Sequence, residues 1–298
     1  MQVPSHVEYE RAKSVEHALD LLARYGPESR VLAGGHSLIP MMKLRLAQPE
    51  TLIDINGIGG LSRLTVTDGE LRIGALVRHA QLLSSSLAAR HFPVLRDAEQ
   101  VIADPIVRNW GTIGGSLCQA DPSEDLSAAF GALRAIAVIQ GRDGPRRVPV
   151  RGFHLGPYET VVAPDELLTE LRIPIPDGRG GHGSAYEKVS RRVGDWSVAA
   201  AAAVLALDAD GTVAEAGLGL AAVGAEHFVS TPAEDFLRGR PADEAAFTEA
   251  GRIAAAHCAP APDQRGPVDY KRHLTGELTT RALRRAASRA GLGPQQRA

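Results

Sequence analysis

The chain is 298 residues long, which is enough for about two domains with separate hydrophobic cores. Its formal net charge of −2 and its 4% aromatic content argue against a nucleic-acid surface, which needs positive charge or stacking rings. It has two cysteines, Cys118 and Cys258. An iron–sulfur cluster needs about four thiolates, so we exclude a cluster held by this chain alone.

The first residues contain no apolar segment of the kind found in signal peptides. The longest apolar run, residues 198–207, is too short and too rich in alanine to span a membrane. We therefore expect a cytoplasmic protein of a reducing compartment without a targeting segment.

Strands and helices are mixed in the first 176 residues. Ser14 is the expected N-cap of the first helix, Ser123 is that of a later one, and Asp68-Gly69 and Asp143-Gly144 predict hairpins. In chain order, the expected elements are a helix at 15–25, strands at 30–33 and 51–55, a hairpin of 64–66 and 71–73, helices at 79–87, 94–103 and 124–133, a hairpin of 135–139 and 147–150, and a strand at 166–173.

The segment 177–183 has four glycines and no apolar residue, which predicts a linker. After it, strands are expected first and helices second, an α+β order. The strands are expected at 185–190, 197–207 and 213–223, and the helices at 233–237, 244–257 and 270–290.

Two Gly-Gly turns are the candidates for chemistry. They are Gly34-Gly35-His36-Ser37 and, with its flanking hydroxyls, Thr112-Ile113-Gly114-Gly115-Ser116. Paired glycines let backbone N–H groups converge on an anionic oxygen, and neither turn contains a lysine or an arginine. Such a nest suits the diphosphate of a cofactor, and two ordinary tight turns are the alternative.

For several other features we expect a structural role rather than a functional one. Gly217-Leu218-Gly219 begins a G-x-G-x-x-A pattern but lies inside an expected strand, which favours close packing over a dinucleotide site. Cys118 is expected to be a small buried residue, with a reactive thiol as the alternative. Trp110 and Trp196 are expected in the core, with a wall for a flat ring as the alternative.

The last predicted helix carries four arginines. A solvated cationic face is expected, and a docking face for an acidic partner is the alternative. The four are Arg281, Arg284, Arg285 and Arg289.

Residues 33–45, Ala-Gly-Gly-His-Ser-Leu-Ile-Pro-Met-Met-Lys-Leu-Arg, closely resemble the first FAD-binding segment of a known family. The family is that of the medium, flavoprotein subunits of carbon monoxide dehydrogenase-type molybdenum hydroxylases, which includes xanthine dehydrogenase. Residues 112–116 with 121–125 are similar to its second FAD segment, and residues 186–196 resemble the join to its C-terminal domain. The resemblance covers nearly the whole chain.

The resemblance implies an α+β architecture. An FAD-binding domain of the vanillyl-alcohol oxidase and p-cresol methylhydroxylase type would span 1–176, with subdomains of about 1–56 and 57–176. The linker 177–183 would lead to a C-terminal domain, 184–298, with a three-stranded antiparallel sheet and helices.

The resemblance also implies the site residues, with no catalytic residue and no metal ligand among them. Asp125 would bond the ribityl chain of FAD, and Leu168 and Lys188 would lie near the isoalloxazine ring. Trp196 stands where the family often has a tyrosine. The resemblance therefore does not determine how far the isoalloxazine ring is shielded from oxygen or another acceptor. The two segments that would hold the diphosphate consist of Ala33, Gly34, Gly35, His36, Ser37 and Leu38, and of Thr112, Ile113, Gly114, Gly115 and Ser116.

The function implied is electron transfer. Electrons from [2Fe–2S] clusters of a small partner subunit would pass through FAD to an external acceptor, and a large subunit would carry the molybdenum cofactor. The assembly would be a dimer of heterotrimers, in the cytoplasm or peripheral at the inner face of the membrane. The resemblance does not identify the reducing substrate or the electron acceptor. The substrate candidates are carbon monoxide, a purine, an N-heterocycle and an aldehyde. A free-standing FAD-dependent oxidase or reductase and a flavin-less scaffold are the alternatives.

Overall fold

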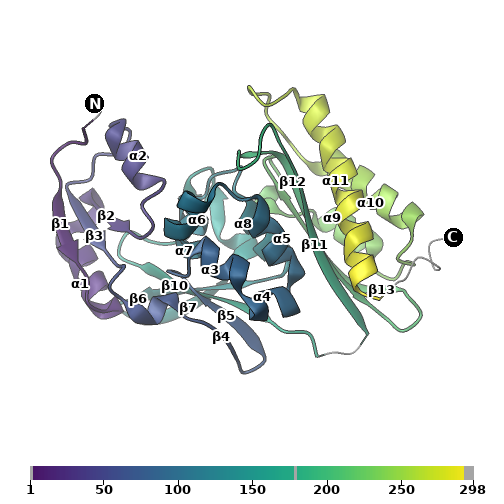
Figure 1. The fold of residues 1–298 in the computed structure, drawn as a ribbon, viewed down its shortest axis with the longest axis horizontal. Coiled ribbons are helices and arrows are strands. Elements are labelled where there is room, and N and C mark those ends of the chain that lie inside the picture. Colours follow the sequence, from purple (N-terminus) through teal and green to yellow (C-terminus); the bar gives the residue numbers. More distant parts are fainter. Residues whose placement is uncertain (1–2, 178–179, 292–298) are drawn as a thin grey trace. The chain divides into compact units, whose positions relative to one another are not determined.

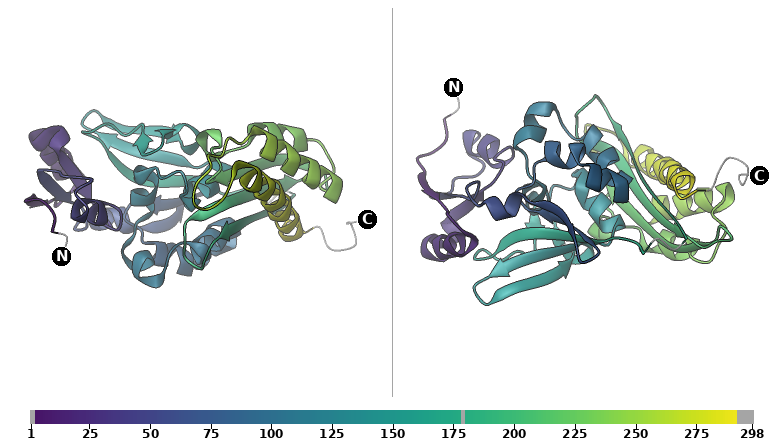
Figure 2. Two further views of the ribbon diagram at one scale, coloured as in Figure 1. Left: turned by 90° about the horizontal axis from the view of Figure 1, so that it is seen from above. Right: turned by 60° about the horizontal axis from the view of Figure 1, so that its bottom comes forward.

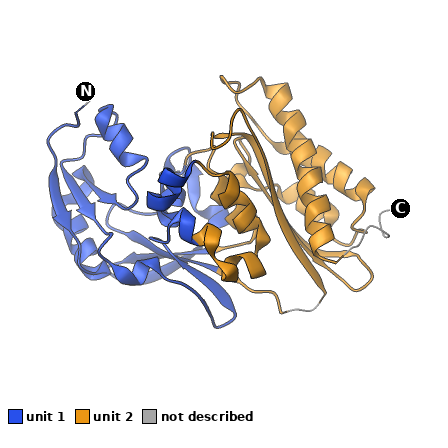
Figure 3. Ribbon diagram, viewed as in Figure 1, with its two compact units in different colours: residues 1–81, 104–120, 136–172 blue, residues 82–103, 121–135, 173–298 orange. Residues whose placement is uncertain are grey.

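A computed structural model describes residues 3–177 and 180–291, which divide into two compact units (Figure 3). Unit 1 comprises Met1–Gln81, Asp104–Ala120 and Ile136–Arg172, and unit 2 comprises Leu82–Ala103, Asp121–Ala135 and Ile173–Ala298. The chain therefore passes between the units several times before it ends in unit 2.

Unit 1 contains most of the short strands (Figure 1). Its strands are β1 (Glu8–Arg11), β2 (Ser29–Leu32), β3 (Thr51–Asp54), β4 (Leu64–Thr67), β5 (Glu70–Gly74), β6 (Ile136–Gly141), β7 (Gly144–Pro149), β8 (His154–Gly156), β9 (Glu159–Thr160) and β10 (Leu167–Pro174), whose last residues belong to unit 2. Its helices are α1 (Val15–Tyr25), α2 (Leu38–Lys43), α3 (His79–Ser84), which continues into unit 2, α6 (Pro105–Trp110) and α7 (Ile113–Gln119).

A parallel sheet of order β1-β3-β2 forms the first part of unit 1. The Ser14 hydroxyl caps α1 by accepting from the His17 N–H at 3.1 Å, as predicted. Ala18, Leu19 and Leu22 of α1 are buried in a core cluster with Ile53 of β3. Spacing of three and four residues places them on one face of the helix.

The second sheet of unit 1 has the order β4-β5-β10-β6-β7, and its strands lie side by side in Figure 2. Both predicted hairpins are confirmed, because β4 pairs antiparallel with β5 and β6 pairs antiparallel with β7. Gly69 (φ +73°) and Gly144 (φ +115°) supply the positive φ that tight hairpin turns require.

Unit 2 is built around three long strands. They are β11 (Gly181–Ser190), β12 (Ser197–Leu207) and β13 (Val213–Ala221). Its helices are α4 (Ser86–His91), α5 (Pro93–Val101), α8 (Asp125–Ala132), α9 (Thr231–Leu237), α10 (Glu244–His257) and α11 (Val268–Arg289). The expected linker, 177–183, includes residues 178 and 179, which lie outside the described residues, and β11 begins within its range.

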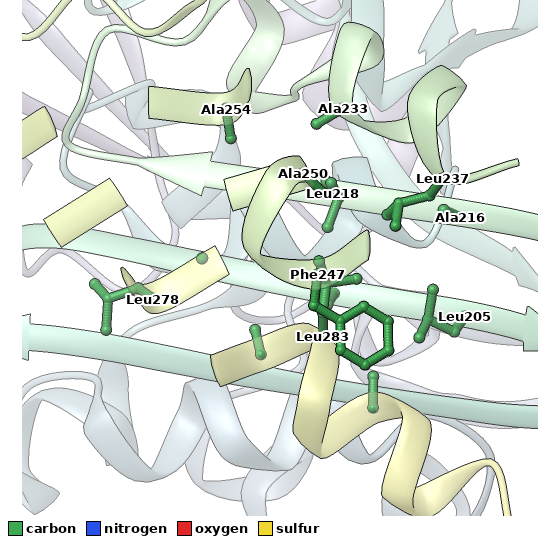
Figure 4. Close-up of a cluster of buried hydrophobic side chains, with 14 of the residues drawn as sticks. Leu205, Ala216, Leu218, Ala233, Leu237, Phe247, Ala250, Ala254, Leu278 and Leu283 are labelled. Carbon is green, nitrogen blue, oxygen red and sulfur yellow. The ribbon is translucent and has the colours of Figure 1, made fainter. Parts of the chain in front are cut away.

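The sheet β11-β12-β13 is antiparallel, as the resemblance implied. Helices α9, α10 and α11 cover one face, and Figure 4 shows Leu218 of β13 beside Phe247 and Ala250 of α10 in the core beneath them. Because side chains alternate along a strand, Gly217 and Gly219 point to the opposite face, where α8 packs. Added Cβ atoms there would lie 2.0 Å and 1.9 Å from carbonyl oxygens of α8.

That close approach confirms the structural interpretation of the G-x-G-x-x-A pattern. No dinucleotide turn forms at these glycines, because they lie inside β13 and serve its contact with α8. The second face of the sheet is thus covered by α5 and α8, which come from the first half of the sequence.

Candidate functional site

The first glycine segment follows β2 in unit 1 and leads into α2. Gly35 has φ +76°, a conformation that favours glycine. Within the part of the chain that the structure describes, the N–H groups of residues 34–38 have no hydrogen-bond partner. Five successive donors that the fold leaves unused are what an anion-binding nest requires.

Gly34 brings the two glycine segments together. A Cβ added to it would lie 2.4 Å from the carbonyl oxygen of Trp110 and 2.8 Å from Cα of Gly111. No side chain fits at such distances, so the missing Cβ allows residue 34 to touch the chain that enters the second segment.

The second glycine segment differs from the expected turn, because residues 113–119 form helix α7. Thr112 is its N-cap, and its hydroxyl accepts from the Gly115 N–H at 3.1 Å. Ile113 and Gly114 donate to carbonyl oxygens of Val77 and Ala75, which follow β5, both at 2.9 Å. The prediction of a turn was wrong because the capping threonine and these contacts to the chain after β5 start a helix there.

The N–H groups of this second segment are therefore used within unit 1. Gly114 also has a packing role, since a Cβ on it would lie 2.6 Å from Cβ of Ala75. Gly115 is exposed at the start of α7.

Arg78 and Asn56 join the first segment to the chain before the second, and the sequence analysis missed both. The Arg78 guanidinium donates to the carbonyl oxygen of Trp110 and, at 2.6 Å, to Oδ1 of Asn56. Asn56 Nδ2 donates in turn to the carbonyl oxygen of Ala33 at 2.8 Å. No local pattern marks Arg78, which is distant in sequence from both segments.

Asp54, at the end of β3, holds Asn56 from the other side. Its Oδ1 accepts from the Asn56 backbone N–H at 2.8 Å and from Asn56 Nδ2 at 2.7 Å, and its Oδ2 accepts from the Tyr9 hydroxyl at 2.5 Å. Burial would raise the pKa of Asp54, but these hydrogen bonds lower it overall. Asp54 thus stays ionised and fixes the amide of Asn56.

In unit 2, Asp125 and Lys188 form a buried ion pair. Lys188 Nζ lies 2.8 Å from Oδ2 of Asp125, and the two side chains are 3% and 6% exposed. Oδ1 of Asp125 accepts from the hydroxyls of Tyr186 and Ser197, both at 2.7 Å. Both oxygens of this predicted site residue are already engaged within unit 2, and sequence reasoning missed Tyr186 and Ser197.

The start of α8 orients Asp125. Glu124 caps the helix, and its carboxylate accepts from the N–H groups of Leu126 and Ser127 at 2.9 Å and 2.6 Å. The prediction of Ser123 as the cap was wrong by one residue, because the longer Glu124 side chain reaches those donors. Asp125 is therefore the first residue of α8.

The other two predicted residues differ in exposure. Leu168 is 3% exposed in β10, beside a register shift between residues 168 and 170. Trp196 is 45% exposed at the end of the loop between β11 and β12, and Trp110 of unit 1 is 60% exposed. The expectation that both tryptophans are core residues was wrong.

The four arginines of α11 differ: the side chains of Arg281 and Arg284 are 60% and 43% exposed, as a solvated face requires, whereas the other two bind a buried carboxylate. Arg285 and Arg289 donate to the buried carboxylate of Asp97 in α5 at 2.7 Å and 2.6 Å. For these two arginines the expectation was wrong, because they are turned towards α5 and β11, where Arg285 also pairs with Glu187 at 2.7 Å.

The two cysteines are both free. Cys258 is buried, whereas Cys118, expected to be buried, is exposed on α7. Among residues 3–177 and 180–291, no three acidic, histidine or cysteine side chains gather as metal ligands. Among the same residues, no helix is both long and apolar enough to cross a bilayer.

Known protein families and relatives match this chain over nearly its full length. The family model for the FAD binding domain in molybdopterin dehydrogenase matches residues 5–176, and that for the CO dehydrogenase flavoprotein C-terminal domain matches residues 184–286. The carbon monoxide dehydrogenase medium chain of Afipia carboxidovorans is 40% identical over 97% of this chain and 99% of its own length.

Solved structures give the same result. A chain of carbon monoxide dehydrogenase from Hydrogenophaga pseudoflava superimposes with a TM-score of 0.92 at 41% identity, over 96% of this chain and 99% of its own. A chain of quinoline 2-oxidoreductase from Pseudomonas putida gives a TM-score of 0.88 at 30% identity, over 97% and 99%.

Proposed function

Because this chain belongs to the family of FAD-binding subunits of molybdopterin dehydrogenases, we propose that its residues 33–38 hold the FAD diphosphate through their backbone N–H groups. The chain is a flavoprotein and an oxidoreductase subunit of the carbon monoxide dehydrogenase and xanthine dehydrogenase type. Its fold is that of this family, an FAD-binding domain followed by a C-terminal flavoprotein domain.

The observation that carries the proposal is the run of N–H groups at residues 34–38, which find no hydrogen-bond partner among residues 3–177 and 180–291. A diphosphate offers anionic oxygens to such donors without a lysine in the segment. The Gly115 end of α7 contributes the second part of the phosphate site, together with Thr112, Ile113, Gly114 and Ser116. The residues fit the cofactor, because the first segment supplies donors that the fold itself does not use.

The remaining predicted residues serve the rest of the cofactor. Asp125 bonds the ribityl chain, and Leu168 and Lys188 line the isoalloxazine region. Trp196 covers the ring, which its partial exposure supports. The buried Asp125–Lys188 pair supports this role, because it fixes the geometry of this part of unit 2.

When bound, FAD supplies one- and two-electron redox chemistry. The chain's own residues bind and orient the cofactor, and none of them acts on the reducing substrate. The relatives named above act on carbon monoxide and on quinoline, which supports a large partner subunit as the element that selects the substrate.

The chain works as the medium subunit of a complex. A small subunit with [2Fe–2S] clusters and a large subunit with the molybdenum cofactor accompany it in a dimer of heterotrimers. The complex resides in the cytoplasm or at the inner face of the membrane, which two free cysteines support. The domains are 1–176 and 184–298, separated by the linker 177–183.

The test is FAD retention in a double variant. Gly35→Val with Gly115→Val places branched side chains at a left-handed position and at the exposed start of α7. We expect the purified variant to lose the flavin absorbance of the wild type. Gly239→Val, at a left-handed glycine with open space around it, is the control for backbone strain alone. Unchanged flavin occupancy in the double variant would contradict the assignment, and a wild-type chain without flavin would favour a scaffold.

A further inference from the structure

We propose that Arg78 and Asn56 form a clamp that positions the first glycine segment for the diphosphate of FAD, an inference that rests on the proposed function. Arg78 donates to the carbonyl oxygen of Trp110 and to Asn56, and Asn56 donates to the carbonyl oxygen of Ala33. All four residues belong to unit 1.

Peptide geometry explains what the clamp does. In a trans peptide the C=O and the N–H point to opposite sides, and the described residues contain no cis peptide bond. Asn56 fixes the carbonyl of Ala33, so the N–H of Gly34 in the same peptide unit must point away from Asn56. Gly34 is the first of the five unpartnered donors.

Arg78 controls a second group beside the nest. The Trp110 carbonyl oxygen lies 2.4 Å from the position that a Cβ of Gly34 would occupy. A carbonyl oxygen this close would repel an anion, because it carries the negative end of its dipole. The Arg78 guanidinium has several N–H donors in a fixed plane, so it binds this oxygen and Asn56 at once. Its positive charge offsets the negative end of the carbonyl dipole.

The clamp is itself anchored. Asp54 accepts from Asn56 through its backbone N–H and its amide, and Tyr9 donates to the same carboxylate. The Arg78 guanidinium also lies over the Trp110 ring, 5.9 Å from its centroid. Arg78 and Asn56 are therefore positioning residues that are themselves held by several contacts. Their guanidinium and amide groups bind the backbone carbonyl oxygens of Trp110 and Ala33.

The test measures the affinity of the flavin-free full chain for FAD and for ADP, which carries the diphosphate but lacks the flavin ring. Arg78→Lys keeps the positive charge but lacks the fork, and Asn56→Ala removes the link to Ala33. We expect each to weaken both ligands about tenfold, as for losing a hydrogen bond to a charged group. The double variant should lose little more than one single variant, since the two residues act as one unit.

The matched control is Arg142→Lys, which alters an exposed arginine of unit 1 whose partner is Asp20. It should bind both ligands like the wild type, and thermal midpoints without ligand identify any variant that fails to fold. For such a variant, Arg78→Gln or Asn56→Ser replaces it.

Three results would overturn the clamp. They are wild-type affinity in Arg78→Lys, which would reduce Arg78 to a point charge, fully additive losses in the double variant, and losses for FAD that ADP does not share. A wild-type chain that binds neither ligand would overturn the proposed function instead, so the two failures are distinguishable.

Discussion

Single side chains in this protein are fixed by a few polar contacts, which are exposed in unit 1 and buried in unit 2. In unit 1, Asn56 and Arg78 hold carbonyl groups on either side of Gly34. In unit 2, Tyr186 and Ser197 hold one oxygen of Asp125 while Lys188 pairs with the other. Because a buried polar group without a partner costs about 1–3 kcal/mol, the buried set around Asp125 constrains its residues to one arrangement.

Tyr186 gives a pH-dependent prediction. Burial, together with the neighbouring Asp125 carboxylate, raises the pKa of Tyr186 well above its ordinary value of 10.0. The phenol therefore stabilises the fold fully below the unfolded pKa, and this contribution is lost as pH rises through the folded pKa.

We expect the unfolding free energy of the wild type to fall more steeply above about pH 10, where tyrosine of the unfolded chain ionises, than that of Tyr186→Phe. At neutral pH the variant should be less stable by about 1 kcal/mol, because Asp125 loses a donor. Urea titrations across this range measure both effects. Tyr270→Phe is the matched control, since Tyr270 is 43% exposed, and equal slopes for Tyr186→Phe and the wild type would contradict the assignment.

Secondary-structure elements of unit 2 are locked by an ion-pair network across β11. Asp97 of α5, which is 8% exposed, accepts from Arg285 and Arg289 of α11 and from the Tyr186 N–H at 3.3 Å. Elements far apart in the chain, α5 and α11, are thus joined through one carboxylate. The same strand carries Lys188, so the network lies beside the Asp125 pair.

The variant Asp97→Asn should destabilise unit 2 by about 2 kcal/mol. The estimate lies between an exposed pair and a fully buried one, because the arginine side chains are 40% and 31% exposed. Chemical denaturation measures the loss. Glu249→Gln breaks an exposed pair with Arg252 in the same unit and should cost clearly less stability, because water screens exposed charges. A loss for Asp97→Asn no larger than for this control would show that the network does not hold α11.

As a whole molecule, the chain is one subunit whose chemistry depends on others. Its two cysteines are too few for an iron–sulfur cluster, which needs about four thiolates. Any iron–sulfur cluster that supplies electrons to FAD, as the proposed function requires, is therefore carried by another polypeptide.

Affinity purification through this chain should recover two further polypeptides in equal amounts. We expect native mass spectrometry of the preparation to give a mass for two copies of each, and metal analysis to find iron and molybdenum. A flavin-containing chain that purifies alone and is reduced directly by a small-molecule substrate would support the free-standing oxidase or reductase instead.

The sequence by itself determined many of the longer elements and marked two candidate binding segments. The strand β12 and the helix α10 have the predicted bounds, 197–207 and 244–257, because alternation and helical periodicity are local. The hairpins at Gly69 and Gly144 follow from turn residues for the same reason. The glycine segments and the family resemblance could also be recognised in the sequence, since they are carried by short contiguous motifs.

Only the tertiary structure decided how these parts are held. It joined the chain around Gly34 to Trp110 through Arg78 and Asn56, and it paired Asp97 with arginines of α11. It also showed that residues 113–119 are a helix whose donors are already used. Such contacts join residues that are far apart in sequence. A glycine such as Gly34 or a single charged residue such as Arg78 forms no repeating pattern from which its partner could be predicted.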